Sequence, residues 1–409
     1  MTSPVVVRPG LEVADVIREH GDAFRQRYAA VLTPTQRQAL RDLAACRTAA
    51  LGGHCEHCLD CGHERIAYNS CRNRHCPRCQ ALSRARWLDR QAEHLLPVDY
   101  SHVVFTLPAE LADLARANPT VLYDALFQAA AGAIREVAAD PRHLGAVVGL
   151  VLVLHTWGQT LQHHPHVHGV VTGGGLSCHA GGAIDASPRW VSCRPGFFLP
   201  VRVLSRVFRG QYLSRLRQAF AEGRLRFPGR LAPLGESAAF AAFIGPLHEK
   251  DWVVYAKPPF GGPAGVLKYL ARYSHRVAIS NARLVAMEGG QVAFRYKDYA
   301  DDHRPKTMTL SAEEFLRRFV QHVLPKGFVK VRHYGLLANR HRGERLALCR
   351  RLLFVAAAVV PARGVDEGVV VEPARERCCQ QCGGRRLVCR EVPRESAGGG
   401  GRLPHGDSS

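Results

Sequence analysis

Residues 52–80 constrain this chain more than any other segment, because they contain too few large apolar side chains to fold around a hydrophobic core. They are rich in Cys, His, Gly and Asn instead, and they include two cysteine pairs with CxxC spacing, Cys58 with Cys61 and Cys76 with Cys79. Each CxxC turn directs two thiolates at one ion, and two such turns make the tetrahedral ligand set of a structural zinc. We therefore predict one Zn²⁺ bound by these four cysteines.

Other residues leave the number of ions and the choice of ligands open. The same segment holds further residues of ligand type, namely His54, Cys55, His63, Cys71 and His75. A third CxxC pair near the C-terminus, Cys379 with Cys382, is compatible with a second zinc site. Four thiolates leave no coordination position for water, which favours a structural over a catalytic zinc.

The charge of the chain indicates a polyanionic partner. Its 55 Lys and Arg against 35 Asp and Glu give a net charge of +20, and basic side chains bind phosphates through counterion release. Residues 271–351 carry 17 basic and 7 acidic side chains. The cysteine segment is also rich in arginine, and we expect Arg72, Arg74 and Arg78 to contact DNA. A merely solvated basic face is the alternative.

Length and composition set the expected organisation. A chain of 409 residues with 46% hydrophobic residues can bury a large core. No run of eighteen uncharged apolar residues is visible, so we expect no membrane span and a soluble, cytoplasmic protein whose thiols stay reduced. We predict a helical and zinc-binding domain over residues 1–95 and a larger domain over 96–290. A basic, DNA-binding extension is expected over 291–360, and a partly disordered tail with a CxxC pair over 361–409.

The apolar pattern predicts a sheet with helices around it. Strands are expected in four β-branched or alternating runs, at 101–108, 146–156, 166–172 and 252–256. Helical spacing occurs within 11–50, in the stretch that follows the expected strand at 101–108 and ends near residue 139, and over 201–222. A further helix is expected to begin at Gly262 and Pro263.

One of these strands carries a candidate metal site. His166 and His168 are two residues apart, so in a strand their side chains project from the same face and can chelate one ion. By spacing alone, two histidines in this arrangement are more often ordinary strand residues. Gln159 is our candidate third ligand, with His155, Gln162 and His164 as neighbouring alternatives. The glycine run 173–175 suggests room for a substrate backbone.

Two tyrosines are candidate nucleophiles. Tyr269 and Tyr273 are four residues apart, which places them on one face of the expected helix. A tyrosine hydroxyl attacks phosphate when a metal or a base assists it. The basic side chains around the pair are suited to phosphates, namely Lys268, Arg272 and Arg276. A pair of half-buried core aromatics is the alternative.

These motifs together resemble the insertion sequence 91 family of transposases, which are single-strand nucleases with a His-hydrophobic-His (HUH) motif and tyrosine nucleophiles. The resemblance covers nearly the whole chain and rests on seven segments, Tyr68–Pro77, Phe105–Pro108, His164–Gly175, Trp252–Lys257, Tyr269–Ser280, Arg295–Tyr299 and Arg332–Leu337.

The resemblance implies an α+β fold with a central antiparallel sheet flanked by helices and the metal histidines on a central strand. It implies that His166 and His168 bind Mg²⁺ or Mn²⁺ and that Tyr269 and Tyr273 are the nucleophiles. The expected activity is rolling-circle transposition, in which single-stranded DNA at transposon ends and target is nicked and rejoined through a 5′-phosphotyrosine. A replication initiator or relaxase, and a zinc-dependent DNA-binding protein without activity, are the alternatives.

Overall fold

The computed structural model describes residues 10–179, 181–196, 198–260, 262, 265–267, 269, 277–357 and 378–394. The strands are β1 (Gly53–Cys58), β2 (Glu64–Tyr68), β3 (Tyr100–Thr106), β4 (Ala146–Trp157), β5 (His163–Ser177), β6 (Trp190–Ser192), β7 (Val254–Phe260), β8 (Leu284–Glu288), β9 (Gln291–Asp298), β10 (Arg304–Ser311), β11 (Val331–Gly335) and β12 (Leu387–Val392).

The α-helices are α1 (Val13–Arg27), α2 (Pro34–Ala44), α3 (Gln80–Ala92), α4 (Ala112–Ala117), α5 (Pro119–Ala139), α6 (Val201–Ala221), α7 (Ser237–Glu249), α9 (Ala312–Val320) and α10 (Arg342–Ala357). Short 3-10 turns are η1 (Ala49–Leu51), η2 (Ala109–Leu111), η3 (Gly229–Gly235) and η4 (Asn281–Arg283). Within the described residues, no helix has both the length and the apolar character needed to cross a membrane.

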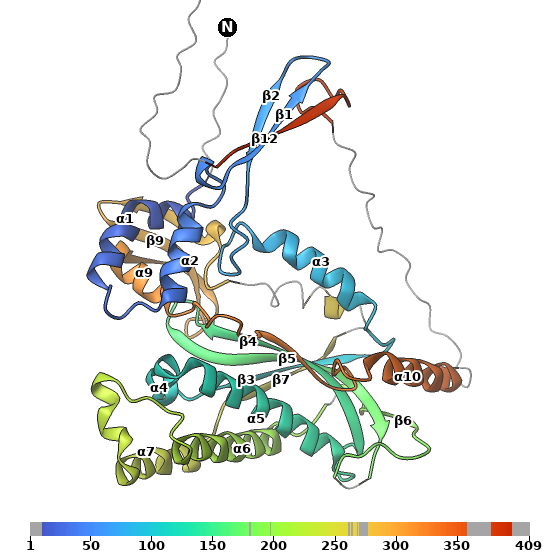
Figure 1. The fold of residues 1–409 in the computed structure, drawn as a ribbon. Helices are drawn as coiled ribbons and strands as arrows, with labels where there is room; N and C mark the ends of the chain where they lie inside the picture. Colours follow the sequence, from blue (N-terminus) through green and yellow to red (C-terminus); the bar gives the residue numbers. More distant parts are fainter. Residues whose placement is uncertain are drawn as a thin grey trace, which may run out of the picture.

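The largest sheet is antiparallel, with the strand order β11-β4-β5-β3-β7 and β6 paired to the end of β5 (Figure 1). Alternate side chains of its strands, such as Phe105, Leu152 and Val167, point to one face and are fully or almost fully buried. Helices α5 and α6 cover this face, contributing Phe127 and Phe208 to the same core. This α+β architecture with a central antiparallel sheet and flanking helices is the predicted HUH-like fold.

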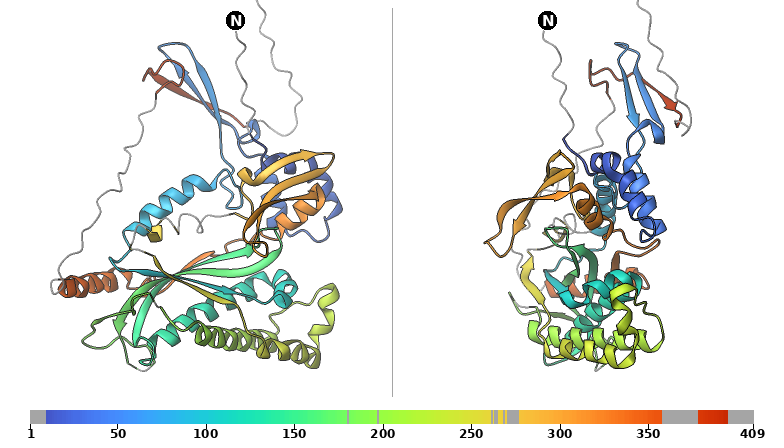
Figure 2. Two further views of the ribbon diagram at one scale, coloured as in Figure 1. Left: turned by 180° about the vertical axis from the view of Figure 1, so that it is seen from behind. Right: turned by 90° about the vertical axis from the view of Figure 1, so that its left-hand side faces the viewer.

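The second core joins segments that are far apart in the sequence. Helices α1 and α2 pack against the sheet β10-β9-β8 and helix α9, as Figure 2 shows from two sides. Val13 and Leu40 from the N-terminal helices share this core with Phe294 and Phe315. Parts of the ranges 1–95 and 291–360, which we predicted as separate units, are therefore packed together.

Local signals in the sequence account for the N-terminal helices. Thr33 accepts a hydrogen bond from the Gln36 backbone at 3.2 Å, and the Gln36 side chain accepts one from the Thr33 backbone at 2.9 Å, so the two form a capping box. Pro34 occupies the first helical position, where its missing N–H leaves no intrahelical bond unmade. Helix α2 therefore begins where the local sequence supplies both a cap and a proline.

A third, smaller sheet has the order β12-β1-β2 and extends from the rest of the molecule (Figures 1 and 2). All five residues of β2 are exposed, so this sheet has no apolar core of its own. Strand β12 comes from the segment that we predicted as a C-terminal tail. It pairs with β1 from Gly53–Val392 to Cys58–Leu387.

The glycine run at 173–175 does not open space for a substrate, contrary to our expectation. These residues lie inside β5, and a Cβ at Gly174 would come within 2.5 Å of the Val191 carbonyl oxygen. At Gly175 it would come within 2.1 Å of the Val147 carbonyl oxygen. The glycines are needed because neighbouring backbones approach β5 this closely.

Candidate active site and cysteine clusters

A cluster of three histidines lies on the face of the large sheet that is opposite α5 and α6. His166 pairs with His155 of β4 and lies two residues before His168, so all three side chains project from the same face. Their ligand nitrogens lie within 4.8 Å of one another. The predicted pair is therefore part of a triad whose third member is His155, the neighbour that we named beside Gln159.

Hydrogen bonds orient two of these imidazoles. His166 Nδ1 lies 2.7 Å from the carbonyl oxygen of His164 and donates to it, so Nε2 is the ring nitrogen that carries the lone pair in the neutral imidazole. This Nε2 lies 3.1 Å from His168 Nε2. Both nitrogens therefore face the centre of the cluster, as ligands of one ion would.

Tyr269 joins the cluster from the other side of His168. Its hydroxyl oxygen is 2.9 Å from His168 Nδ1 and also forms a hydrogen bond with His102 Nε2. Its ring is 9% exposed and packs with Tyr100 and Val170 of the sheet. The sequence-predicted nucleophile and the sequence-predicted histidine pair thus meet at one place.

His102 is a site residue that sequence reasoning missed. It lies on β3, and its Nε2 is 3.2 Å from His168 Nδ1. Burial, and to a smaller extent the positive charge of Lys257, lowers the pKa of His102 to about 3. The alternation of β3 places His102 and Phe105 on opposite faces, but only the pairing of β3 with β5 brings this histidine to the site.

The remaining predicted site residues fall elsewhere or outside the described part. Gln159 turns its amide to the sheet β10-β9-β8, where its Nε2 donates to the Tyr299 hydroxyl at 3.1 Å and its Oε1 accepts from the Lys297 backbone at 3.5 Å. We therefore replace Gln159 by His155 as the third ligand. Four further predicted residues, Lys268, Arg272, Tyr273 and Arg276, lie outside the described residues.

The histidine triad is compatible with a divalent metal. Two cis ligands of an octahedral ion with bonds of about 2.1 Å lie about 3.0 Å apart, close to the 3.1 Å between the two Nε2 atoms. His166 and His168 are half-buried, so the outer side of the cluster faces solvent. Three imidazoles are softer donors than Mg²⁺ prefers, and they suit transition metals better.

The predicted four-cysteine set is wrong, because the structure divides it between two clusters. Cys76 and Cys79 are joined by Cys46 and Cys71, and Cys58 and Cys61 lie in another group. A CxxC pair supplies two ligands of a zinc site, and any two further thiolates that the fold brings near can supply the other two. In both clusters these further thiolates come from other segments of the sequence. The spacing within a CxxC pair therefore does not predict them.

The first cluster, Cys46, Cys71, Cys76 and Cys79, has the dimensions of a zinc site. The Sγ atom of Cys79 lies 3.5 Å from that of Cys46 and 3.6 Å from that of Cys71, and the Sγ atoms of Cys76 and Cys46 are 3.6 Å apart. Tetrahedral zinc with bonds of about 2.3 Å separates its sulfurs by about 3.8 Å, whereas a disulfide brings them to about 2.0 Å.

The three arginines predicted to bind DNA have different surroundings. Arg72 is exposed. Arg74 donates to the carbonyl oxygen of Phe328 at 2.7 Å, and burial lowers its pKa. Arg78 forms an ion pair with Glu12 at 3.1 Å. Of the three, Arg72 is the side chain directed to solvent.

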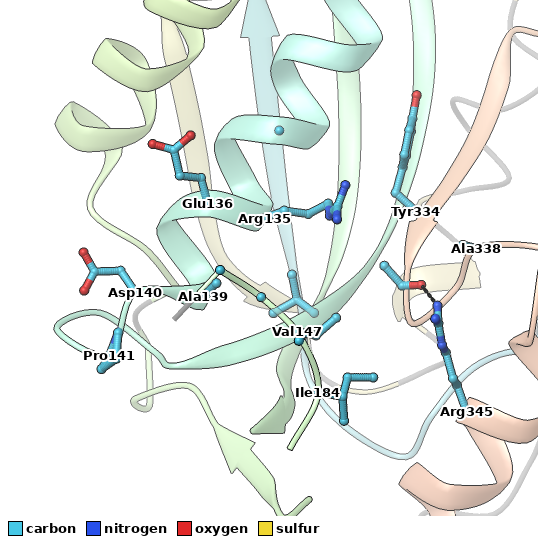
Figure 3. A pocket seen from close by; sticks show the side chains of 16 residues that line it. Arg135, Glu136, Ala139, Asp140, Pro141, Val147, Ile184, Tyr334, Ala338 and Arg345 are labelled. Atoms are coloured by element: carbon cyan, nitrogen blue, oxygen red, sulfur yellow. Dashed lines mark hydrogen bonds between the residues drawn. The ribbon is translucent and has the colours of Figure 1, made fainter. Parts of the chain in front are cut away.

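A large cavity lies away from these sites. It measures 1020 Å³ and includes Val147, at the opposite end of β4 from His155. Figure 3 shows Arg135 and Glu136 on one side and Arg345 on the other, where Arg345 donates to the Gly335 carbonyl oxygen at 3.0 Å. None of the candidate site residues lines it.

Comparison with known proteins gives two family matches and two curated relatives. Residues 149–345 match the family model described as "Putative transposase", and residues 16–107 match the one described as "Transposase zinc-binding domain". The chain is 53% identical over 348 residues to "Putative transposase y4qJ" of Sinorhizobium fredii, which covers 85% of each protein. It is 31% identical over 312 residues to the "Transposase for insertion sequence element IS801" of Pseudomonas savastanoi pv. phaseolicola, covering 76% of this chain and 72% of that protein. No solved structure matches the chain.

The fold, the clusters and these matches define a DNA transposase with a zinc-binding domain. Its task is therefore to cleave DNA and transfer strands, and DNA is its partner. The chain belongs to the insertion sequence 91 family of transposases, as the motifs indicated.

Proposed function

We propose that this transposase nicks and rejoins single-stranded DNA through a 5′-phosphotyrosine, in rolling-circle transposition. The observation that carries the proposal is the position of the Tyr269 hydroxyl, 2.9 Å from Nδ1 of His168, whose Nε2 faces His166. A nucleophile beside a metal-ligand cluster is an arrangement suited to phosphoryl transfer.

In the cleavage step, the Tyr269 oxygen attacks the scissile phosphorus. His102 Nε2 and His168 Nδ1 both contact the hydroxyl, so they orient it, and an unprotonated ring nitrogen there accepts its proton. The new bond joins the tyrosine oxygen to phosphorus, and the bond from phosphorus to the 3′ oxygen breaks. The 3′ oxygen takes up a proton and leaves as a free hydroxyl, while the 5′ end stays on the protein.

His155, His166 and His168 would hold the divalent ion, Mg²⁺ or Mn²⁺, which as a Lewis acid supplies charge stabilisation to the phosphate. The sheet contributes rigidity, because all three histidines lie on paired strands rather than on loops.

Rejoining is the reverse reaction with a different hydroxyl. A 3′-hydroxyl attacks the phosphotyrosine, the bond from phosphorus to the tyrosine oxygen breaks, and the tyrosine recovers its proton. The link conserves the energy of the broken phosphodiester, so no ATP is needed. A second nucleophile, for which Tyr273 is our candidate, allows two successive transfers without release of an end.

The surface beside the histidines favours a single strand. Tyr255 of β7 is paired with Val104, which is in turn paired with His168, so the tyrosine projects from the histidine face. Its side chain is 52% exposed, and the exposed Lys257 lies two residues further along the strand. An exposed aromatic ring next to a cation binds unpaired bases by stacking.

The test is to incubate the purified protein with end-labelled single-stranded oligonucleotides from the element's ends and a divalent metal, and then to separate the products under denaturing conditions. We expect a covalent protein–DNA adduct that carries the 5′ side of the nick, and peptide mapping to find nucleotide on Tyr269 or Tyr273. The double variant Tyr269→Phe with Tyr273→Phe removes both hydroxyls and should form no adduct. Tyr68→Phe, on the exposed strand β2, is the matched control and should form it normally.

Two outcomes would contradict the proposal. An adduct formed equally well by the double variant would exclude both tyrosines as nucleophiles. If the wild-type protein binds these strands but forms no adduct on any of them, a DNA-binding protein without activity is the better interpretation.

A further inference from the structure

The second cysteine cluster brings together two CxxC pairs that are far apart in the sequence. Cys58 is the last residue of β1 and Cys61 lies just after it, whereas Cys379 and Cys382 precede β12. The Sγ atoms of Cys58 and Cys382 are 3.7 Å apart, and those of Cys61 and Cys379 are also 3.7 Å apart. These separations are near the about 3.8 Å expected between sulfurs on tetrahedral zinc and far from the length of a disulfide.

The two CxxC turns also have the same backbone structure, and this observation is independent of the distances between the sulfur atoms. Gly62 donates to the Cys58 carbonyl oxygen at 2.9 Å, and Gly383 donates to the Cys379 carbonyl oxygen at the same distance. Both glycines have positive φ, 74° and 73°, a conformation that glycine adopts without strain. Each turn therefore presents two thiols in the same way, as paired zinc-binding turns do.

Further contacts hold the two turns together. The Leu59 backbone donates to the Arg386 carbonyl oxygen at 2.9 Å, and Arg386 Nε donates to Asp60 Oδ1 at 2.6 Å. These bonds continue the pairing of β1 with β12, so the register of that pair brings the two cysteine pairs face to face.

Hydrophobic burial does not explain why this sheet is stable. Strand β2 is exposed along its whole length, and most of β12 is exposed as well. A three-stranded sheet without an apolar face needs another source of stability, and metal binding is one that such small units use. Cys58 and Cys379 are 0% and 5% exposed, whereas Cys61 and Cys382 are exposed, so the cluster lies at the surface with two of its four thiols buried.

We infer that Cys58, Cys61, Cys379 and Cys382 form a second structural zinc site, separate from the one at Cys46 and its partners, which fastens β12 to the hairpin β1–β2. The matched zinc-binding domain, residues 16–107, contains half of these ligands, so the C-terminal segment completes the site. The inference is independent of the proposed chemistry at Tyr269.

The test is the zinc content of the full-length protein, measured by mass spectrometry of the metal against protein concentration. We expect two zinc ions per chain in the wild type and one in the variant Cys379→Ser with Cys382→Ser. The matched control is Cys378→Ser with Cys389→Ser, which changes two exposed cysteines that lie outside the described clusters and should leave two ions. The variant Cys382→His keeps a zinc ligand and should also retain two.

One ion in the wild type, or two in the Cys379→Ser with Cys382→Ser variant, would overturn the inference. If that variant is insoluble, cobalt titration of the metal-free wild type replaces it. If the absorption that is characteristic of cobalt bound by four thiolates increases until two equivalents of cobalt have been added, the protein has two such sites. If this absorption saturates at one equivalent, the second site is refuted.

Discussion

Replacement of Cys46 by serine separates the two possible assignments of the N-terminal zinc. The CxxC spacing alone selects Cys58, Cys61, Cys76 and Cys79, and with those ligands Cys46→Ser would leave zinc binding unchanged. The observed cluster makes Cys46 a direct ligand, with its Sγ 3.5 Å from that of Cys79. The variant therefore loses one of the four thiolates, and we expect it to lose this zinc.

The size of the effect follows from where the cluster lies. Cys46 and Cys76 are 0% and 2% exposed and belong to the core that includes Leu43 and Phe294. Structural zinc contributes about 10–16 kcal/mol to the folding of small zinc domains, which is comparable to the roughly 5–15 kcal/mol that separates most native proteins from the unfolded state. Without the metal, the buried cysteine side chains in this core lose the ion that holds them together. We expect α1, α2 and the sheet β10-β9-β8 to unfold at a much lower temperature.

The assay is zinc content together with thermal unfolding followed by circular dichroism. Cys349→Ser is the matched control, because Cys349 is also 0% exposed but lies outside the described clusters. It buries one hydroxyl, costs about 1–3 kcal/mol, and keeps the full zinc content. A Cys46→Ser protein with wild-type zinc content and melting temperature would refute the assignment.

Three further predictions concern acid stability, strand binding and metal. Burial lowers the pKa of His322 from 6.5 to about 4, so as pH falls the unfolded chain protonates this imidazole before the folded protein does. The free energy of unfolding therefore decreases between about pH 6.5 and pH 4, by an amount on the order of 3 kcal/mol. Denaturant unfolding should show a weaker pH dependence for His322→Gln. Tyr255→Ala should weaken binding of single-stranded oligonucleotides by about 5- to 100-fold while Tyr255→Phe retains it, and equal affinity of both variants in fluorescence anisotropy would exclude stacking. Chelation of the metal should abolish adduct formation, and Mn²⁺ should restore it at a lower concentration than Mg²⁺. His155→Ala should impair this restoration more than Gln159→Ala does. If Gln159→Ala impairs it more, Gln159 and not His155 is the third metal ligand.

Local patterns in the sequence determined the parts of this protein that depend on neighbouring residues. The capping signal at Thr33 starts a helix, and the β-branched run ending at His155 forms a strand. Spacing of two in a strand placed His166 and His168 on one face, because side-chain alternation is a property of the strand itself. The motifs around them also indicated the family.

Tertiary structure decided every partner that comes from a distant segment. Pairing of β3 with β5 brings His102 to Tyr269 and His168, and pairing of β4 with β5 makes His155 the third histidine. The pairing of β1 with β12 combines cysteines that are 324 residues apart, Cys58 and Cys382. Zinc accepts any four thiolates at the right distances, so the spacing within a CxxC pair predicts a ligand pair but not the second pair. That choice depends on strand register and core packing, which the whole chain determines.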